Sequence, residues 1–218
     1  MKKSTLIALT LFLLLTTITS HQKISVSKFK IEEIIIENNY LIKEEDIKKT
    51  LSTIYNKNLF LLRKEEIKGL LTQNSLIEGF KVKKKYPNKL RIRIFEKQPV
   101  AILFEKKKKY YLSEKIDLIE LKDLPNFRDL PQVYANKNDF KIFYNNLMRV
   151  NFPFEQVKKF TLYESGRWDL KMINNVTIKL PPKNYIQSLE NYLSLLNKKD
   201  FKKFSLYDYR INDQLILK

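Results

Sequence analysis

The 218-residue sequence contains no cysteine, one histidine and three glycines. The absence of cysteine excludes disulfide frameworks and cysteine-ligated metal sites, and it leaves the redox compartment open. A single histidine excludes the usual nucleophile–base pairs and most zinc sites. Gly69, Gly79 and Gly166 lie too far apart in the chain to form a phosphate-binding loop. The sequence therefore predicts a binding protein, not an enzyme, with no cofactor and no metal.

Acidic residues are also scarce, because 24 Asp and Glu stand against 42 Lys and Arg and give a net charge of +18. Such a charge is found in proteins that bind nucleic acid or an anionic membrane surface. Here the lysines are scattered along every segment, and the densest cluster, residues 105–111, is typical of a charged turn between two strands. No basic stretch is interleaved with aromatic residues for base stacking. We expect no specific nucleic acid partner and no small-molecule substrate.

The N-terminus holds a long uncharged run. Residues 4–20 follow Lys2 and Lys3 and are largely apolar, which is the lower end of the length that crosses a bilayer. A cleaved signal peptide has the same basic start and apolar core, so both alternatives stay open. We expect residues 1–23 to be a cytoplasmic N-terminus and a retained transmembrane anchor. The rest of the chain would be exported in either case.

Residues 24–99 have the pattern of a small β-α-α-β-β domain. The Ile-rich residues 29–37 predict a strand, which Asn38 and Asn39 end. Residues 44–54 and 63–73 each place acidic residues before apolar residues at helical spacing, and they predict two helices. Two alternating strands flank the turn sequence "YPNK" at 86–89.

The sequence "FEKQPVAILF" at 95–104 predicts the joint between two domains. A strand that ends near Glu96 meets Pro99, whose nitrogen cannot donate to a strand ladder. An apolar run that begins at Val100 then starts the next sheet. We therefore expect the domain joint at Glu96, Pro99 and Val100.

Residues 100–218 predict a mixed, largely antiparallel β-rich domain with two helices, so the whole chain is α+β. Strands are expected at 100–104, 109–113 and 116–121, and residues 124–134 at a proline-punctuated connection. A helix with Phe140, Phe143, Tyr144 and Leu147 at helical spacing follows, and then a three-strand meander within 157–180. A second helix, from about 183 to 197, has Ile186, Leu189, Tyr192, Leu193 and Leu196 as its core face. Residues 203–218 predict strand, turn at Asn212 and Asp213, and strand.

This order and these motifs resemble the FtsQ/DivIB family of bacterial cell-division proteins over nearly the whole chain. The N-terminal features are "IIIENN", "NLFLL" and "VKKKYPNKLRIRIFEKQPVA", preceded by a single apolar segment, and they resemble that family's POTRA domain. The C-terminal features are Trp168 on a strand, the apolar strand 178–180, and Asp208 with Arg210 in the last hairpin. Two positions depart from the family pattern, because Lys43 replaces a frequent Ser cap and Ile211 a frequent Tyr.

The resemblance implies a scaffold of the division machinery, anchored in the cell inner membrane with its bulk in the periplasm and concentrated at the septum. It implies divisome membrane proteins as partners: FtsB, itself paired with FtsL, at the C-terminal edge, and others through the POTRA domain. A short terminal strand with a free edge can accept an extended partner segment through backbone hydrogen bonds. The expected partner-binding residues are Asp208, Arg210, Ile211, Gln214, Leu215, Ile216 and Leu217.

Arg210 is the best single candidate, because a guanidinium can hold a partner carboxylate by two hydrogen bonds. An internal pair with Asp208, two positions away, is the alternative for this residue. The competing functions for the whole chain are a secreted, POTRA-containing periplasmic binding protein and an accessory of outer-membrane assembly.

Overall fold

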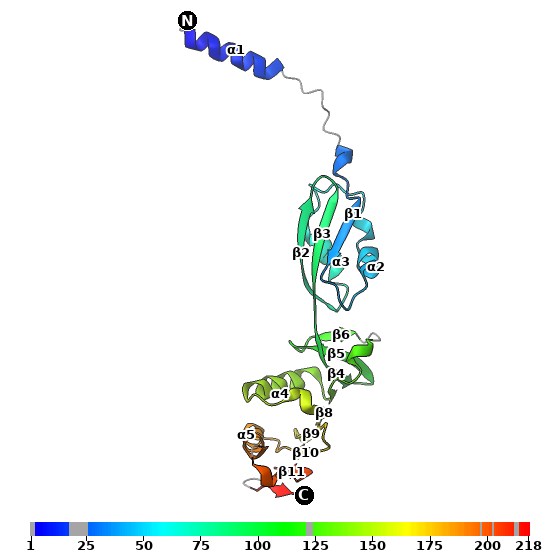
Figure 1. Ribbon diagram of the computed structural model, residues 1–218, viewed down its shortest axis with the longest axis vertical. Coiled ribbons are helices and arrows are strands. Elements are labelled where there is room, and N and C mark those ends of the chain that lie inside the picture. The colour runs from blue at the N-terminus through cyan, green and yellow to red at the C-terminus, as the bar shows by residue number, and fades with distance from the viewer. Residues whose placement is uncertain (1–2, 18–25, 121–123, 197, 202, 212–213) are drawn as a thin grey trace. The chain divides into compact units, whose positions relative to one another are not determined.

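The computed structural model of the protein describes residues 3–17, 26–120, 124–196, 198–201, 203–211 and 214–218 (Figure 1). The chain forms two compact units. Unit 1 comprises Met1–Asn38, Lys43–Leu71 and Phe80–Ile94, and unit 2 comprises Asn39–Ile42, Thr72–Gly79 and Phe95–Lys218. The domain boundaries predicted from the sequence, at residues 23 and 99, stay predictions.

The N-terminal apolar segment contains helix α1, Lys3–Thr17. Its leucines and Phe12 are each more than half exposed. Over the described ranges of the chain, no helix reaches the length and apolarity that a membrane crossing requires. Part of the predicted anchor, residues 18–23, lies outside the described residues, so the anchor remains a prediction.

A three-stranded sheet follows, with the strand order β1-β3-β2. Its strands are β1 (Glu33–Glu37), β2 (Ile77–Lys85) and β3 (Lys89–Glu96), and β1 runs parallel to β3 with Glu33 opposite Lys89. Helices α2 (Glu44–Thr50) and α3 (Lys64–Leu71) lie between β1 and β2 in the chain. The predicted β-α-α-β-β order is confirmed.

The first strand is shorter than predicted. Residues Val26–Phe29 form a 3-10 turn, η1, and β1 begins only at Glu33. The backbone of Phe29 and Ile31 bonds to the loop before α3 instead of to the sheet. Leu59 N donates to Phe29 O at 2.8 Å, and Ile31 N donates to Lys57 O at 3.0 Å. A second short 3-10 turn, η2 (Ser52–Ile54), extends α2.

The core of this region follows the alternation of the strands. Leu90, Ile92 and Ile94 on β3 are fully buried, and so are Ile34 of β1 and the helix residues Ile47, Ile67 and Leu71. The opposite face carries ion pairs, with Glu33 2.6 Å from Lys89 and Glu37 3.1 Å from Arg91. The N-cap of α2 is Lys43, which makes no side-chain cap, and Glu44, Glu45 and Asp46 in the first turn interact with the helix dipole instead.

A nine-stranded sheet forms most of unit 2, with the order β12-β11-β10-β9-β8-β7-β4-β5-β6. The strands are β4 (Pro99–Glu105), β5 (Lys108–Ser113), β6 (Leu118–Glu120), β7 (Gln132–Tyr134), β8 (Val157–Leu162), β9 (Trp168–Met172), β10 (Thr177–Lys179), β11 (Leu206–Asp208) and β12 (Ile216–Leu217). Three neighbouring pairs are parallel: β4 with β7, β7 with β8 and β10 with β11. The remaining pairs are antiparallel, so the sheet is mixed.

Two helices form the connections of two of these parallel pairs. Helix α4 (Lys137–Arg149) joins β7 to β8, and helix α5 (Tyr185–Leu196) joins β10 to β11. Both lie on the same side of the strands (Figure 1). Short 3-10 turns occur at Pro125–Phe127 (η3), Phe154–Gln156 (η4) and Lys199–Phe201 (η5).

Two details of this sheet differ from the expectation. The segment predicted as a connection contains β7, which lies in the middle of the sheet between β4 and β8; three residues directly after Pro131 are too short to show a period. On α5, Leu195 is buried while Leu193 and Leu196 are half-buried. The predicted turn at Asn212 and Asp213 lies outside the described residues, but the strands on either side of it are confirmed.

The core of unit 2 contains a set of packed aromatic rings. Trp168 on β9 stacks on Phe143 of α4, with ring centroids 4.3 Å apart and planes 13° from parallel. Phe140 packs edge-on against Phe160 of β8, and Tyr192 of α5 edge-on against Tyr207 of β11. These contacts attach both helices to the sheet and fix the position of its C-terminal strands.

Candidate partner-binding edge

Strand β12 is the last strand of the nine-stranded sheet, and it pairs only with β11 within that sheet. The two strands are antiparallel, with Tyr207 opposite Leu217 and Asp208 opposite Ile216. Leu206 and Lys218 exchange both of their backbone hydrogen bonds, at 3.0 and 3.3 Å. Because such pairs recur every second residue, Ile216 also faces β11, while the backbone N–H and C=O groups of Leu215 and Leu217 face away. The sheet therefore ends in an edge with outward-directed backbone groups.

The side chains of this edge divide between the two faces of the sheet. Leu215 and Leu217 are half-buried and pack against the core on the helix side. Ile216 is 39% exposed and shares the opposite face with its partner Asp208. The sequence prediction had named these residues without assigning them to faces, because their direction depends on the pairing register.

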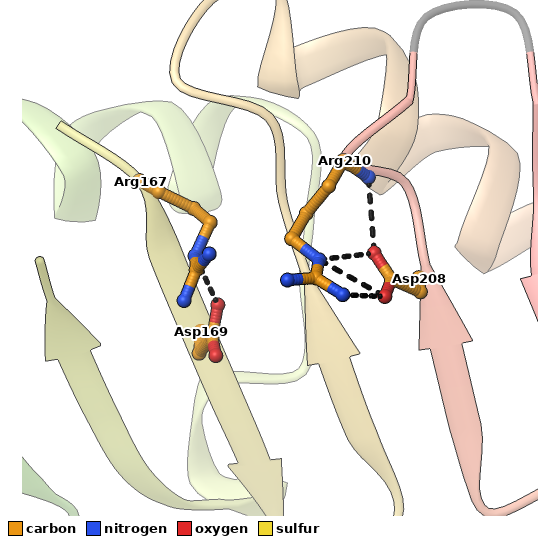
Figure 2. A network of polar contacts seen from close by, with 4 residues as sticks. All are labelled: Arg167, Asp169, Asp208 and Arg210. Atoms are coloured by element: carbon orange, nitrogen blue, oxygen red, sulfur yellow. Dashed lines mark hydrogen bonds and ion pairs between the residues drawn. The ribbon is translucent and has the colours of Figure 1, made fainter. Parts of the chain in front are cut away.

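Arg210 is bound to Asp208 in the isolated chain (Figure 2). The Nε atom lies 2.8 Å from Oδ1 and 3.0 Å from Oδ2 of Asp208, and Nη2 lies 2.6 Å from Oδ2. The backbone N–H of Arg210 also donates to Oδ1, at 3.1 Å. The internal pair that the sequence left as an alternative is thus present.

The two partners differ in exposure. The Asp208 side chain is only 5% exposed, whereas 43% of the Arg210 side chain is accessible. The hydrogen bonds from Arg210 lower the pKa of Asp208 against the opposing effect of burial. The same bonds raise the pKa of Arg210. The buried, ionised carboxylate of Asp208 thus holds the accessible guanidinium of Arg210 beside the edge.

A second ion pair lies on the same face, two strands away (Figure 2). Arg167 Nε lies 3.1 Å from Asp169 Oδ1, and the ladder places Asp169 opposite Lys179 and Lys179 opposite Asp208. Burial raises the pKa of Asp169 although Arg167, Lys179 and Arg210 act to lower it. The sequence analysis missed this group; the only signal was a charged residue between buried Trp168 and Leu170.

A cleft of about 400 Å³ opens beside β12 on the side of α5. It is lined by Pro181, Lys183, Asn184, Gln187, Ser188, Asn191, Tyr209, Ile211, Gln214 and Leu215. The Tyr209 hydroxyl donates to Asn191 Oδ1 at 3.0 Å and fixes one wall. The structure thus brings Ile211, Gln214 and Leu215 together around one cleft, while Asp208 and Ile216 lie on the other face of the sheet.

The predicted joint residues have defined structural roles. The Glu96 carboxylate accepts hydrogen bonds from the backbone N–H groups of Tyr40, Leu41 and Ile42, at 3.0, 2.8 and 2.9 Å. Pro99 is buried and is the first residue of β4, opposite Ser113. Val100 packs against the core of unit 2. That these residues separate two independent domains remains a prediction.

Two family models match adjacent parts of this chain. The model "POTRA domain, FtsQ-type" matches residues 29–97, and "Cell division protein FtsQ/DivIB, C-terminal" matches residues 101–210. The chain belongs to the FtsQ/DivIB family of bacterial cell division proteins. Both halves of the resemblance inferred from the sequence are thereby confirmed, including the less distinctive C-terminal half.

Individual FtsQ/DivIB proteins show the same relationship. The cell division protein FtsQ of Rickettsia felis is 29% identical over 172 residues, which cover 78% of this chain and 64% of the relative. DivIB of Clostridium tetani is 29% identical over 164 residues, with 69% of this chain and 60% of the relative covered. The chain therefore spans somewhat less than two thirds of the length of these curated relatives.

A solved structure is also similar to this chain. It is the major extracytoplasmic domain of the trans isomer of the cell division protein DivIB from Geobacillus stearothermophilus, at 15% identity and a TM-score of 0.33. The match covers 49% of this chain and 96% of that domain.

Proposed function

We propose that the chain is a non-enzymatic scaffold of the division machinery that binds an FtsB/FtsL-like partner by adding the partner's strand to β12. The observation that carries this proposal is the outward direction of the Leu215 and Leu217 backbone groups, which the antiparallel register implies. An extended segment that pairs with them satisfies these groups and extends the sheet by one strand. The cleft at Ile211, Gln214 and Leu215 lies where side chains of such a segment can enter.

Arg210 contributes specificity in this proposal. Its Nε and Nη2 atoms are held by Asp208, and among the described residues no hydrogen bond or ion pair involves Nη1. A partner carboxylate can therefore bind the accessible side of the guanidinium without displacing Asp208. Ile211, which is 51% exposed, gives an apolar contact in the cleft on the α5 side.

Proline substitutions test the strand addition. Leu217→Pro and Leu215→Pro remove N–H groups that face away from β11, so they should abolish capture of the partner while the β11–β12 pair remains. Leu217→Val is the matched control, because it keeps the backbone N–H and an apolar side chain. Arg210→Glu should weaken capture by about tenfold, since its guanidinium lies at an accessible rim. Full capture by folded proline variants, in a pull-down checked by circular dichroism, would contradict the proposal.

We also propose that the N-terminal segment, 1–23, anchors the protein in the cell inner membrane, with residues 24–99 and 100–218 as two periplasmic domains. The support is the uncharged run at 4–20, which begins directly after two lysines. Alkaline extraction of membranes separates the alternatives. An anchored chain stays in the pellet, whereas a chain cleaved near residue 21 appears in the supernatant with a new N-terminus.

A further inference from the structure

Three aromatic rings pack together in unit 1, and we name them, with the exposed neighbour of Phe60, the aromatic tip: Phe29, Phe60, Leu61 and Tyr86. The Phe60 ring packs 4.7 Å from Phe29 and stacks 4.6 Å from Tyr86, measured between centroids. Leu61 is 76% exposed, Phe60 55% and Tyr86 53%. The cluster combines the end of η1, the loop before α3 and the turn between β2 and β3.

The loop that carries Phe60 and Leu61 is held in this conformation by its own contacts. Leu59 and Leu62, on either side, are buried at 0% and 5% exposure, so four consecutive apolar residues divide into two inward and two outward side chains. Phe60 N donates to Asn58 Oδ1 at 2.9 Å, and Lys84 Nζ donates to the carbonyl oxygens of Phe60 and Leu62 at 3.1 and 2.9 Å. A fixed, contiguous apolar patch on a soluble surface marks an interaction site.

The charges around the tip favour an anionic surface. Lys28 and Lys30 flank Phe29 and are exposed, and Lys85 precedes Tyr86. Of the carboxylates at this end, Glu32 accepts a hydrogen bond from Asn88 and Glu66 pairs with Lys57. Among the described contacts, no acidic partner is seen for Lys28, Lys30 or Lys85. Aromatic rings beside such lysines match the interface of an anionic bilayer, where Tyr and other amphipathic rings lie at headgroup depth.

The covalent chain limits the distance between the tip and helix α1. Phe29 follows Thr17 by twelve residues. A chain of that length spans at most about 40 Å when fully extended. We propose that the aromatic tip inserts into the headgroup region of the membrane that anchors α1, and so orients unit 1 against the bilayer surface. The inference rests on the proposed membrane anchorage of the N-terminal segment.

The absence of native cysteine allows single labels to be placed cleanly. Leu61→Cys in the full chain carries an environment-sensitive fluorophore, and the protein is reconstituted in phosphatidylglycerol-containing vesicles with shallow or deep nitroxide-labelled lipids. Tyr40→Cys is the control, because Tyr40 is 80% exposed and follows β1 in the chain, whereas Phe29 precedes it. Leu11→Cys reports independently on insertion of α1.

We expect the shallow nitroxide to quench the Leu61 label several times more strongly than the Tyr40 label. Phe60→Ser with Tyr86→Ser should remove this difference, with an unchanged circular dichroism spectrum. Equal quenching at Leu61 and Tyr40 overturns the proposal, and so does shielding of the Leu61 label that appears only when partner proteins are added. Deep quenching at Leu11 without quenching at Leu61 refutes the tip contact alone, whereas lack of quenching at Leu11 refutes the anchor.

Discussion

Replacing Glu96 by alanine should open the turn at residues 40–42. The Glu96 carboxylate is the acceptor for three consecutive backbone N–H groups there, at 2.8–3.0 Å. In the alanine variant these donors lose their acceptor, and nothing else in the described contacts replaces it. Glutamine keeps one acceptor oxygen, so Glu96→Gln should retain the bonds of Tyr40 and Leu41 and lose that of Ile42.

The magnitude follows from the number and exposure of the bonds. A hydrogen bond to a charged group contributes about 1.5–3 kcal/mol when both groups leave water. Glu96 is half-buried and Tyr40 is 80% exposed, so water partly replaces each lost bond. About 1 kcal/mol per bond then gives ~3 kcal/mol for Glu96→Ala and ~1 kcal/mol for Glu96→Gln.

Amide hydrogen exchange measures this effect locally. At 1.4 kcal/mol per factor of ten, exchange at residues 40–42 should accelerate about 100-fold in Glu96→Ala and about 5-fold in Glu96→Gln. Glu164→Ala, an exposed carboxylate in the connection between β8 and β9, should leave these amides unchanged. Unaltered exchange at residues 40–42 in Glu96→Ala would refute the assigned role of the carboxylate.

Two further predictions concern unit 2. Trp168→Ala removes the ring that stacks on Phe143 at 4.3 Å and should lower the free energy of unfolding by about 3–5 kcal/mol, measured by urea titration with circular dichroism; a loss under 1 kcal/mol would contradict this packing. Because Arg210 lowers the folded-state pKa of Asp208, their pair stabilises the fold above the unfolded pKa of about 3.9 and loses that contribution as pH falls through the folded value. Acid unfolding should therefore be less steep in Asp208→Asn, and an identical pH profile would exclude the pair as a source of stability.

Local patterns in the sequence predicted most of the elements. The apolar residues of 137–149 recur at helical spacing, and α4 buries Phe140, Phe143 and Leu147 as expected. The alternation at 89–96 predicted which side chains of β3 are buried. The Asp208–Arg210 pair was also foreseeable, because its partners are only two residues apart.

Features that depend on distant pairing were not predictable. Residues 40–42 and Glu96 are more than fifty positions apart, and nothing in either segment indicates the other. The Arg167–Asp169 pair lies on the same face as Asp208 because β10 pairs with both β9 and β11. Nothing in the sequence of β9 indicates that arrangement. The sequence "NLFLL" at 58–62 likewise does not show that Phe60 and Leu61 are the exposed residues. The apolar run has only four residues, which is too short to show a period.

Residue-resolved amide exchange at β12, with and without a bound FtsB/FtsL-like partner, tests the proposed strand addition most directly. The outward N–H groups of Leu215 and Leu217 should exchange rapidly in the free chain and become protected in the complex. The N–H of Ile216, which faces β11, should change much less. A complex in which Leu215 and Leu217 stay unprotected, while amides elsewhere slow, would contradict binding at this edge.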